Sequence, residues 1–252
     1  MVFVTGDCHA EFNKFSTKNF PEQKETTRDD IVIVCGDFGL AWHDNEEERY
    51  WFKWLSKKNF TVVFVDGNHE NFDRLYSDEF PVVNFHGGKA HKIRDNIYHL
   101  MRGYVFEFDG KKFFCFGGAS SHDISDGILD RTDFDSDEEF VATVKDWDKR
   151  WKMFRINHLS WWKQELPTED ELAFGLQTLI QNGNKVDYII SHCCPQEIAS
   201  FCGFREPDVL TQWFSMVAHT VQFDKWYFGH YHDNRQIMSK FILLYEKIER
   251  VL

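Results

Sequence analysis

The sequence predicts an α/β fold, and three features indicate this class. Short apolar runs rich in β-branched residues alternate along the chain with longer segments of helical periodicity. Turn residues such as Gly and Asp directly follow the apolar runs. The chain has 252 residues, of which 42% are hydrophobic and 17% aromatic, so it can bury a sizeable core and is not a disordered chain.

The first part of the chain is expected to supply buried strands and one helix. Residues 2–5, 31–35 and 61–65 are apolar or β-branched almost throughout, which is typical of strands covered on both faces. The segment 45–58 has apolar residues at helical spacing, acidic residues at its start and lysines at its end. That charge order suits the helix dipole, so the segment predicts a helix.

The second part of the chain repeats this alternation. Strands are predicted at 103–108 and 112–116, with Asp109–Gly110 as the hairpin turn between them. A helix at 169–182 is expected to begin with a capping box, because Glu171 follows Thr168 by three positions. The remaining expected elements are a strand at 186–191, a helix near 207–220, and closing strands at 225–229, 235–238 and 241–246.

Residues 122–162 differ from the rest because they are rich in Asp and Trp. We interpret them as an inserted helical excursion within a single domain that spans residues 1–252, and as a candidate lid or specificity wall. The tryptophans of this region can either stack a base or form a small core that holds the insertion together, and the core is the favoured interpretation; they are Trp147, Trp151, Trp161 and Trp162.

Charge and cysteine usage restrict the partners and the compartment. The formal net charge of −12 disfavours nucleic acid and anionic membranes as partners, although a local cluster of cations can override the average. The sequence shows neither a signal-peptide pattern nor an apolar run of about 18 residues. Its six cysteines lack C-x-x-C spacing and are expected to be free thiols, which predicts a cytoplasmic location.

Polar motifs follow five of the predicted strands. They are Asp7-x-His9, Gly36-Asp37, Gly67-Asn68-His69-Glu70, His192 and Gly229-His230-x-His232. Ligands of open α/β sheets bind at the carboxyl ends of the strands, so these side chains are expected to converge. Each motif alone is common, but the five together predict a metal site. Mixed carboxylate, amide and imidazole ligands suit Mn²⁺, Fe, Zn²⁺ or Ni²⁺. They are not the ligands of a thiolate-rich metal site.

This series of motifs resembles the calcineurin-like metallophosphoesterases, and the resemblance extends from Asp7 to His232. It implies two packed mixed β-sheets flanked by helices, with two metal ions at one edge. It also implies a ligand set: Asp7, His9 and His232 for the first ion, Asn68, His192 and His230 for the second, and Asp37 as the bridge between them.

The resemblance implies two further roles in the G-N-H-E motif. His69 is expected to contact the scissile phosphate or to protonate the leaving group. Glu70 is expected either to orient His69 or only to cap the following helix.

The leading hypothesis is hydrolysis of a phosphate mono- or diester of a small molecule or nucleotide. Two cations, with Mn²⁺ the first choice, would lower the pKa of a bridging water and yield a metal-bridging hydroxide near neutral pH. The same charges would stabilise an in-line transition state. A nuclease and a non-catalytic binding scaffold are the alternatives.

The sequence departs from the family pattern at two places. Ala10 stands where many relatives carry Gly, and the segment after Asp37 lacks the Arg with which protein phosphatases of the family clamp phosphate. The second departure disfavours a protein Ser/Thr phosphatase.

Several other polar residues have two interpretations. His122 and Asp123 can approach the site, but a surface loop is favoured; Arg131 and Arg155 can bind phosphate or be solvated charges. The histidines interpreted as structural or exposed are His43, His86, His91, His99, His158 and His219.

Overall fold

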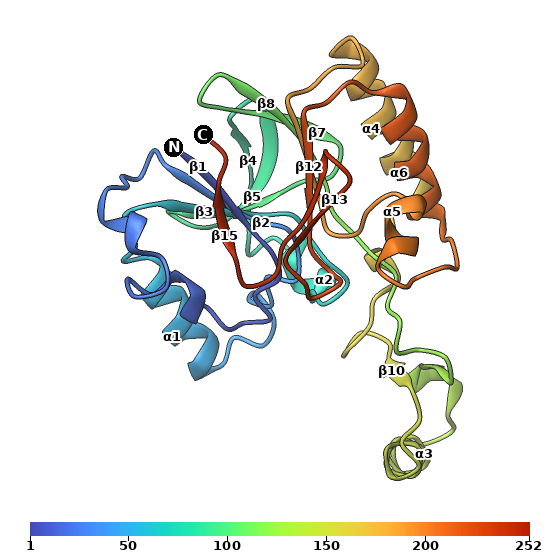
Figure 1. The fold of residues 1–252 in the computed structure, drawn as a ribbon. Helices are drawn as coiled ribbons and strands as arrows, with labels where there is room; N and C mark the ends of the chain where they lie inside the picture. Colours follow the sequence, from blue (N-terminus) through green and yellow to red (C-terminus); the bar gives the residue numbers. More distant parts are fainter.

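Two β-sheets pack face to face, and helices cover their outer faces (Figure 1). This arrangement is seen in a computed structural model that describes residues 1–252. It confirms the α/β class expected from the sequence and the paired mixed sheets implied by the resemblance. None of the helices is long and apolar enough to cross a membrane.

The first sheet has seven strands in the order β15-β1-β2-β3-β6-β5-β4. Its central strands β1, β2, β3 and β6 are parallel, and its outer strands are antiparallel to their neighbours. The strands are β1 Val2–Thr5, β2 Ile31–Val34, β3 Thr61–Phe64, β4 Val82–Phe85, β5 Gly88–Arg94, β6 Ile97–Leu100 and β15 Ile248–Arg250. Helices α1 Glu46–Leu55 and α2 Phe72–Leu75 belong to this half of the chain.

The second sheet has six strands in the order β13-β14-β12-β11-β8-β7, and β8, β11, β12 and β14 are parallel. The strands are β7 Tyr104–Phe108, β8 Lys111–Phe116, β11 Tyr188–Ser191, β12 Lys225–Phe228, β13 Arg235–Ile237 and β14 Phe241–Leu243. Its helices are α4 Glu169–Gln181, α5 Gln196–Phe201 and α6 Val209–Thr220. The capping box of Thr168 and Glu171 at the start of α4 is confirmed.

Alternation of side chains along the strands explains the layers. In β1, Val2 and Val4 point into the core between the sheets, where Ile190 of the second sheet also lies. Phe3 points to the outer face and packs in a separate core with Phe52 of α1. The two faces of this strand pack in two different cores. This is why the sequence of the strand is hydrophobic almost without interruption.

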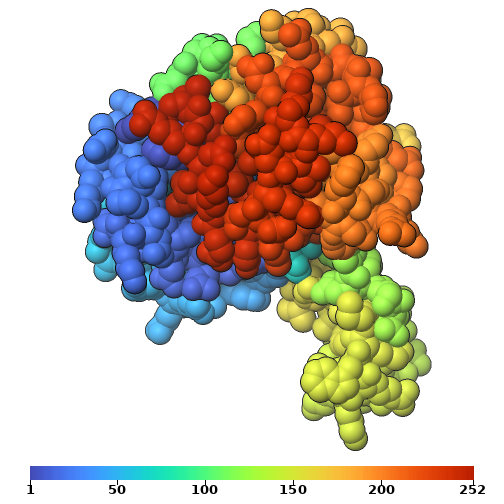
Figure 2. Space-filling model, viewed as in Figure 1, coloured from blue at the N-terminus to red at the C-terminus, as the bar shows by residue number.

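The inserted segment projects away from the two sheets (Figures 1 and 2). It contains β9 Gly127–Leu129, α3 Asp137–Lys149 and β10 Phe154–Ile156, and no residue of α3 is buried. The expected core of four tryptophans is wrong for Trp151, which is 91% exposed. Trp162 is buried instead against Trp42 of the main body, and its Nε1 donates to Asp73.

The sequence did not predict β4, β5, β6, β15, α2 and α5, nor β9 and β10 within the segment expected to be helical. Strand β4 is short, lies at the edge of the sheet and has no buried residue, although three of its four residues are apolar. Strand β5 interrupts its apolar residues with Lys89, Lys92 and Arg94. Strands of this kind are stabilised by pairing with neighbours that a local pattern does not reveal.

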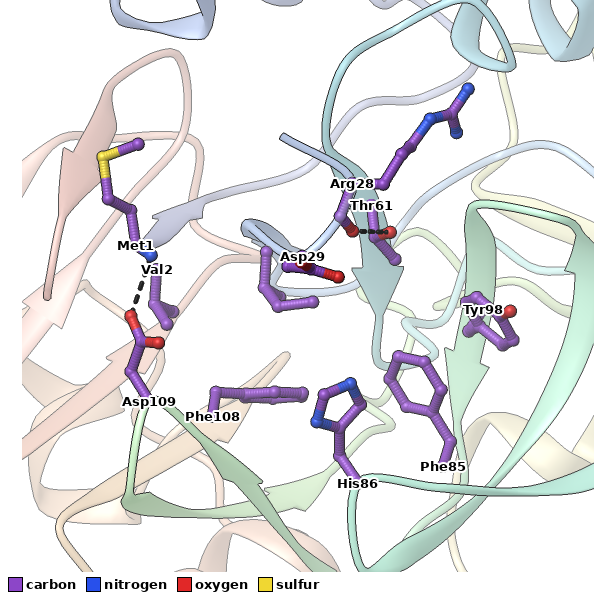
Figure 3. A pocket seen from close by; sticks show the side chains of 11 residues that line it. Met1, Val2, Arg28, Asp29, Thr61, Phe85, His86, Tyr98, Phe108 and Asp109 are labelled. Atoms are coloured by element: carbon purple, nitrogen blue, oxygen red, sulfur yellow. Dashed lines mark hydrogen bonds and ion pairs between the residues drawn. The ribbon is translucent and has the colours of Figure 1, made fainter. Parts of the chain in front are cut away.

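A hollow of about 360 Å³ opens at the amino-terminal ends of β1, β2 and β3 (Figure 3). Aromatic rings of Phe85, His86 and Phe108 line one side of it. This hollow lies at the opposite ends of the strands from the five polar motifs, so it is separate from the predicted site.

A buried polar chain crosses the first sheet behind the polar motifs. Nδ1 of His91 lies 2.9 Å from Nδ1 of His99, and Nε2 of His99 lies 3.1 Å from Oδ1 of Asp66. The other Asp66 oxygen accepts from Nε of Arg102 at 2.9 Å. Asp66, His99 and Arg102 are at most 5% exposed, so the chain depends on mutual pairing.

We expect the stability of the protein to fall as pH drops from about 6.5 toward 4. Burial, and then the charge of His99, lowers the pKa of His91 from 6.5 to about 4. In that window the unfolded chain takes up a proton that the native His91 does not, so protonation favours unfolding. Urea midpoints measured at pH 7 and pH 5 should show the fall, and a His91→Gln variant should show a shallower one. An equal slope in both proteins would contradict this.

Candidate metal centre

The five polar motifs meet where the carboxyl ends of both sets of parallel strands come together. Asp7 follows β1, Asp37 follows β2, Asn68 follows β3, His192 follows β11 and His230 follows β12. Two groups of possible metal ligands result, each with ligand atoms within 4.8 Å of one another: Asp7, His9 and His232 in one, and Asp7, Asp37 and His192 in the other.

The first group contains the three residues implied for the first ion. Nε2 of His232 lies 3.2 Å from Oδ2 of Asp7, and Nε2 of His9 lies 3.7 Å from the same oxygen. The two imidazole nitrogens are 3.0 Å apart. Asp7 is buried, whereas His9 and His232 reach the surface, so this side of the centre is open to solvent.

The second group is buried around His192, which is not exposed at all. Its Nε2 lies 3.3 Å from Oδ1 of Asp37 and 3.2 Å from Oδ1 of Asn68. Its Nδ1 lies 2.7 Å from the carbonyl oxygen of Cys35 and must donate to it. This contact fixes the ring so that Nε2 faces the oxygen ligands, as a metal-binding histidine requires.

Asp37 connects the two groups. Its Oδ2 lies 3.8 Å from Nε2 of His9, while its Oδ1 faces His192 and accepts the main-chain N–H of His69 at 2.8 Å. The ring of His69 is 5.4 Å from the ring of His9, centroid to centroid. Asp37 therefore lies between His9 and His192, and Asp7 is the residue that belongs to both groups.

Four of the thirteen non-glycine residues with positive φ angles are polar residues of this centre. Left-handed φ angles occur at His9 (46°), Asp37 (47°), His230 (70°) and His232 (48°). Such angles are unfavourable for non-glycine residues and persist where the surrounding structure enforces them, often at functional sites. Neighbouring glycines make room: a Cβ on Gly67 would lie 2.0 Å from Oδ1 of Asp37, and one on Gly229 would lie 2.1 Å from Oδ1 of Asp7.

The charges at the centre favour a cation. Asp7 and Asp37 are at most 2% exposed, and their ion-pair partners are histidines, not Lys or Arg. Burial acts to raise the pKa of Asp37, but the charge and hydrogen bond of His192, together with the charges of His69 and His9, outweigh it and lower that pKa. The paired carboxylates in turn raise the pKa of His192 to about 10 against the effect of burial. Buried carboxylates with nitrogen and amide donors fit divalent ions well.

The structure gives Glu70 a role that differs from both expected ones. Its carboxylate accepts the main-chain N–H of Phe38 at 2.8 Å and of Gly39 at 3.4 Å, and it is 1% exposed. Asn71 caps α2 instead. Glu70 thus stabilises the turn that carries Asp37. The G-N-H-E motif does not predict this long-range contact.

His122 lies exposed on a loop, as the sequence interpretation favours, and it also reaches the centre. Nε2 of His122 lies 2.6 Å from Nε2 of His230, and its ring stacks on Phe204 at 4.1 Å. Arg155 pairs with Asp123. Burial lowers the pKa of His69, the charge of Asp37 opposes this, and the charge of Arg155 lowers it further. Arg131 instead pairs with Asp137 on the projecting part.

This fold and this centre define a metal-dependent phosphoesterase class. The calcineurin-like phosphoesterase family matches residues 1–234, and the chain belongs to that family. Among curated proteins, lariat debranching enzyme A of Xenopus laevis is 28% identical over 155 residues, which cover 54% of this chain and 27% of that enzyme. The chain therefore spans about a quarter of the length of this relative. The family supports phosphoester hydrolysis and implies divalent metal ions.

We expect a His122→Ala variant to bind the second ion about tenfold more weakly, because two ring nitrogens 2.6 Å apart need a proton or cation between them. Calorimetric titration with Mn²⁺ would measure this. His86→Ala is the matched control, because His86 is exposed and lines the hollow at the far ends of the strands (Figure 3). Equal affinity in both variants would show that His122 does not take part.

Proposed function

We propose that the protein is a binuclear metal-dependent phosphoesterase that hydrolyses a phosphate mono- or diester of a small molecule or nucleotide. The observation that carries the proposal is the position of Asp37, whose two oxygens face separate groups of nitrogen ligands. Family membership supports the same class of reaction. We propose Mn²⁺ as the first choice of metal, with Fe, Zn²⁺ or Ni²⁺ as other candidates.

The proposed ligands are those implied by the sequence: Asp7, His9 and His232 for one ion, Asn68, His192 and His230 for the other, and Asp37 for both. When bound, the ions would supply an activated water and would offset charge in the transition state. Asp7 and Asp37 hold negative charge in a buried place, and Cys35 holds His192 in the ligand tautomer. His69, fixed through its main chain to Asp37, is the proposed proton donor to the leaving oxygen.

The proposal is tested by elemental analysis of protein purified without chelator, together with hydrolysis of bis-p-nitrophenyl phosphate and p-nitrophenyl phosphate in added Mn²⁺. We expect about two ions per chain and activity that chelation removes. The ratio of diester to monoester rates directs the search for the substrate. Protein that binds no metal and cleaves neither ester would support the binding scaffold instead.

We propose that Arg155 contacts the substrate phosphate, in place of the Arg that is missing after Asp37. Asp123 pairs with its guanidinium, whose charge acts on the pKa of His69, and Arg is well suited to phosphate. An Arg155→Ala variant should lose about 10- to 100-fold in kcat/KM for the model ester while keeping its metal. Arg131→Ala, which alters an Arg on the projecting segment, is the matched control and should be unchanged. Equal loss in both variants would argue against the role.

A nuclease is the second candidate, because the 28% identical relative is a lariat debranching enzyme. The net charge of −12 disfavours it. Metal-dependent cleavage of single- and double-stranded oligonucleotides at low salt, absent in Asp37→Ala, would establish it.

We also propose that residues 1–252 form one domain with an inserted segment at about 122–162, and that the protein works in the cytoplasm. All six cysteines are free and five are buried, which supports a reducing compartment. Localisation of a tagged chain tests this.

A further inference from the structure

A buried chain of hydrogen bonds leads from Asn68 to the end of the inserted segment. Nδ2 of Asn68 donates to Oγ of Ser121 at 3.2 Å, and Oγ of Ser121 donates to Oε2 of Glu165 at 2.6 Å. The main-chain N–H of Ser121 donates to the other Glu165 oxygen at 3.0 Å. All three residues are at most 5% exposed, so water does not compete for these bonds.

The direction of these bonds determines which way the Asn68 amide points. A carboxylate only accepts hydrogen bonds, so the Ser121 hydroxyl must donate its single hydrogen to Glu165. Its oxygen is then left to accept from Asn68, and only the NH₂ end of that amide can donate. The amide oxygen consequently faces the metal centre, where it lies 3.2 Å from Nε2 of His192.

Glu165 is itself held firmly in place. Its carbonyl oxygen accepts from the main-chain N–H of Ala119 at 3.1 Å, and Nη2 of the buried Arg102 donates to the carbonyl oxygen of Gln164 at 2.7 Å. Trp162, three residues earlier, is buried and its Nε1 donates to Asp73 at 2.7 Å. The segment that returns from the insertion is therefore a rigid support, and Ser121 and Glu165 lie on either side of the whole insertion.

We propose that Ser121 and Glu165 are positioning residues, which hold the amide oxygen of Asn68 toward the second metal ion. This rests on the proposed binuclear centre. Partners behind a ligand commonly determine metal affinity by 10- to 100-fold, because they fix the orientation of the ligand atom. In this proposal the base of the insertion completes the metal centre, independently of what the projecting part of the insertion contacts.

The test is titration of the chelator-treated protein with Mn²⁺, followed by the EPR signal of free Mn²⁺. We expect two ions for the wild type, and a second-site affinity that is 10- to 100-fold lower in Ser121→Ala and in Glu165→Gln. Ser121→Thr keeps the hydroxyl and should restore binding. Thr26→Val removes another buried hydroxyl, which donates to the carbonyl oxygen of Gln23, and should leave both affinities unchanged.

Two results would overturn the proposal, and they differ from each other. If Ser121→Ala and Glu165→Gln bind both ions as the wild type does, while Asn68→Ala loses the second, the positioning role is wrong and the metal centre stands. If the wild type binds no Mn²⁺, the centre itself is wrong and the role falls with it. Melting temperatures of all variants show whether a loss of affinity reflects unfolding. Ser121→Thr keeps the hydroxyl, so it separates an effect of the lost hydrogen bond from an effect of unfolding.

Discussion

Replacement of Asp37 by Ala is expected to lower hydrolysis of a phosphodiester by about 10³-fold or more and to reduce bound metal from two ions to at most one. Asp37 faces one ring nitrogen on each side of the centre, Nε2 of His192 through Oδ1 and Nε2 of His9 through Oδ2. A loss of 10³-fold corresponds to about 4 kcal/mol of transition-state stabilisation. Elemental analysis and steady-state rates with bis-p-nitrophenyl phosphate measure the two effects.

Asp187→Asn is the matched control for Asp37→Ala. Asp187 directly precedes β11 and pairs with Lys111, whereas His192 directly follows β11, so the control alters a carboxylate at the other end of the same strand. It should keep both metals and full activity. Retention of two ions and normal rates by Asp37→Ala would mean that Asp37 is not shared between ions, and the binuclear assignment would have to be withdrawn.

The parallel strands other than β6, and most of the proposed ligands, were predictable from the sequence for a physical reason. β1, β2 and β3 serve a core on each face, so they appear as unbroken apolar runs with an abrupt polar end. Neighbouring parallel strands end at one edge, which makes the convergence of Asp7, Asp37 and Asn68 a consequence of topology.

The residues that support the ligands were not predictable in the same way. Glu70 acts on a turn 31 or 32 residues earlier, and Ser121 contacts residues 53 and 44 positions away in either direction. His122 contacts a histidine 108 residues later. Local periodicity carries no signal for such contacts, because the choice of partner depends on how the two sheets pack.

Replacement of Asp66 by Ala is expected to destabilise the protein by about 3–5 kcal/mol. The Asp66 carboxylate is fully buried, and it accepts from Nε of Arg102 at 2.9 Å and contacts Nε2 of His99 at 3.1 Å. Its removal leaves the buried guanidinium of Arg102 with only the partly exposed Glu171, 3.6 Å away, as a counter-charge. That costs far more than the loss of an exposed pair. Thermal unfolding should show a melting temperature roughly 6–20 °C lower.

Asp95→Ala provides the matched control, because Asp95 pairs with Lys92 at 2.9 Å on the surface and should leave the melting temperature unchanged. A double variant that also changes Arg102 to Met should regain part of the stability lost in Asp66→Ala, since no charge is then left buried alone. The recovery would be incomplete, because Arg102 also donates to the carbonyl oxygen of Gln164 at the return from the insertion. If Asp66→Ala instead melts like Asp95→Ala, the buried chain from His91 to Arg102 does not stabilise the fold, and the rigid support argued for Glu165 loses one of its three anchors.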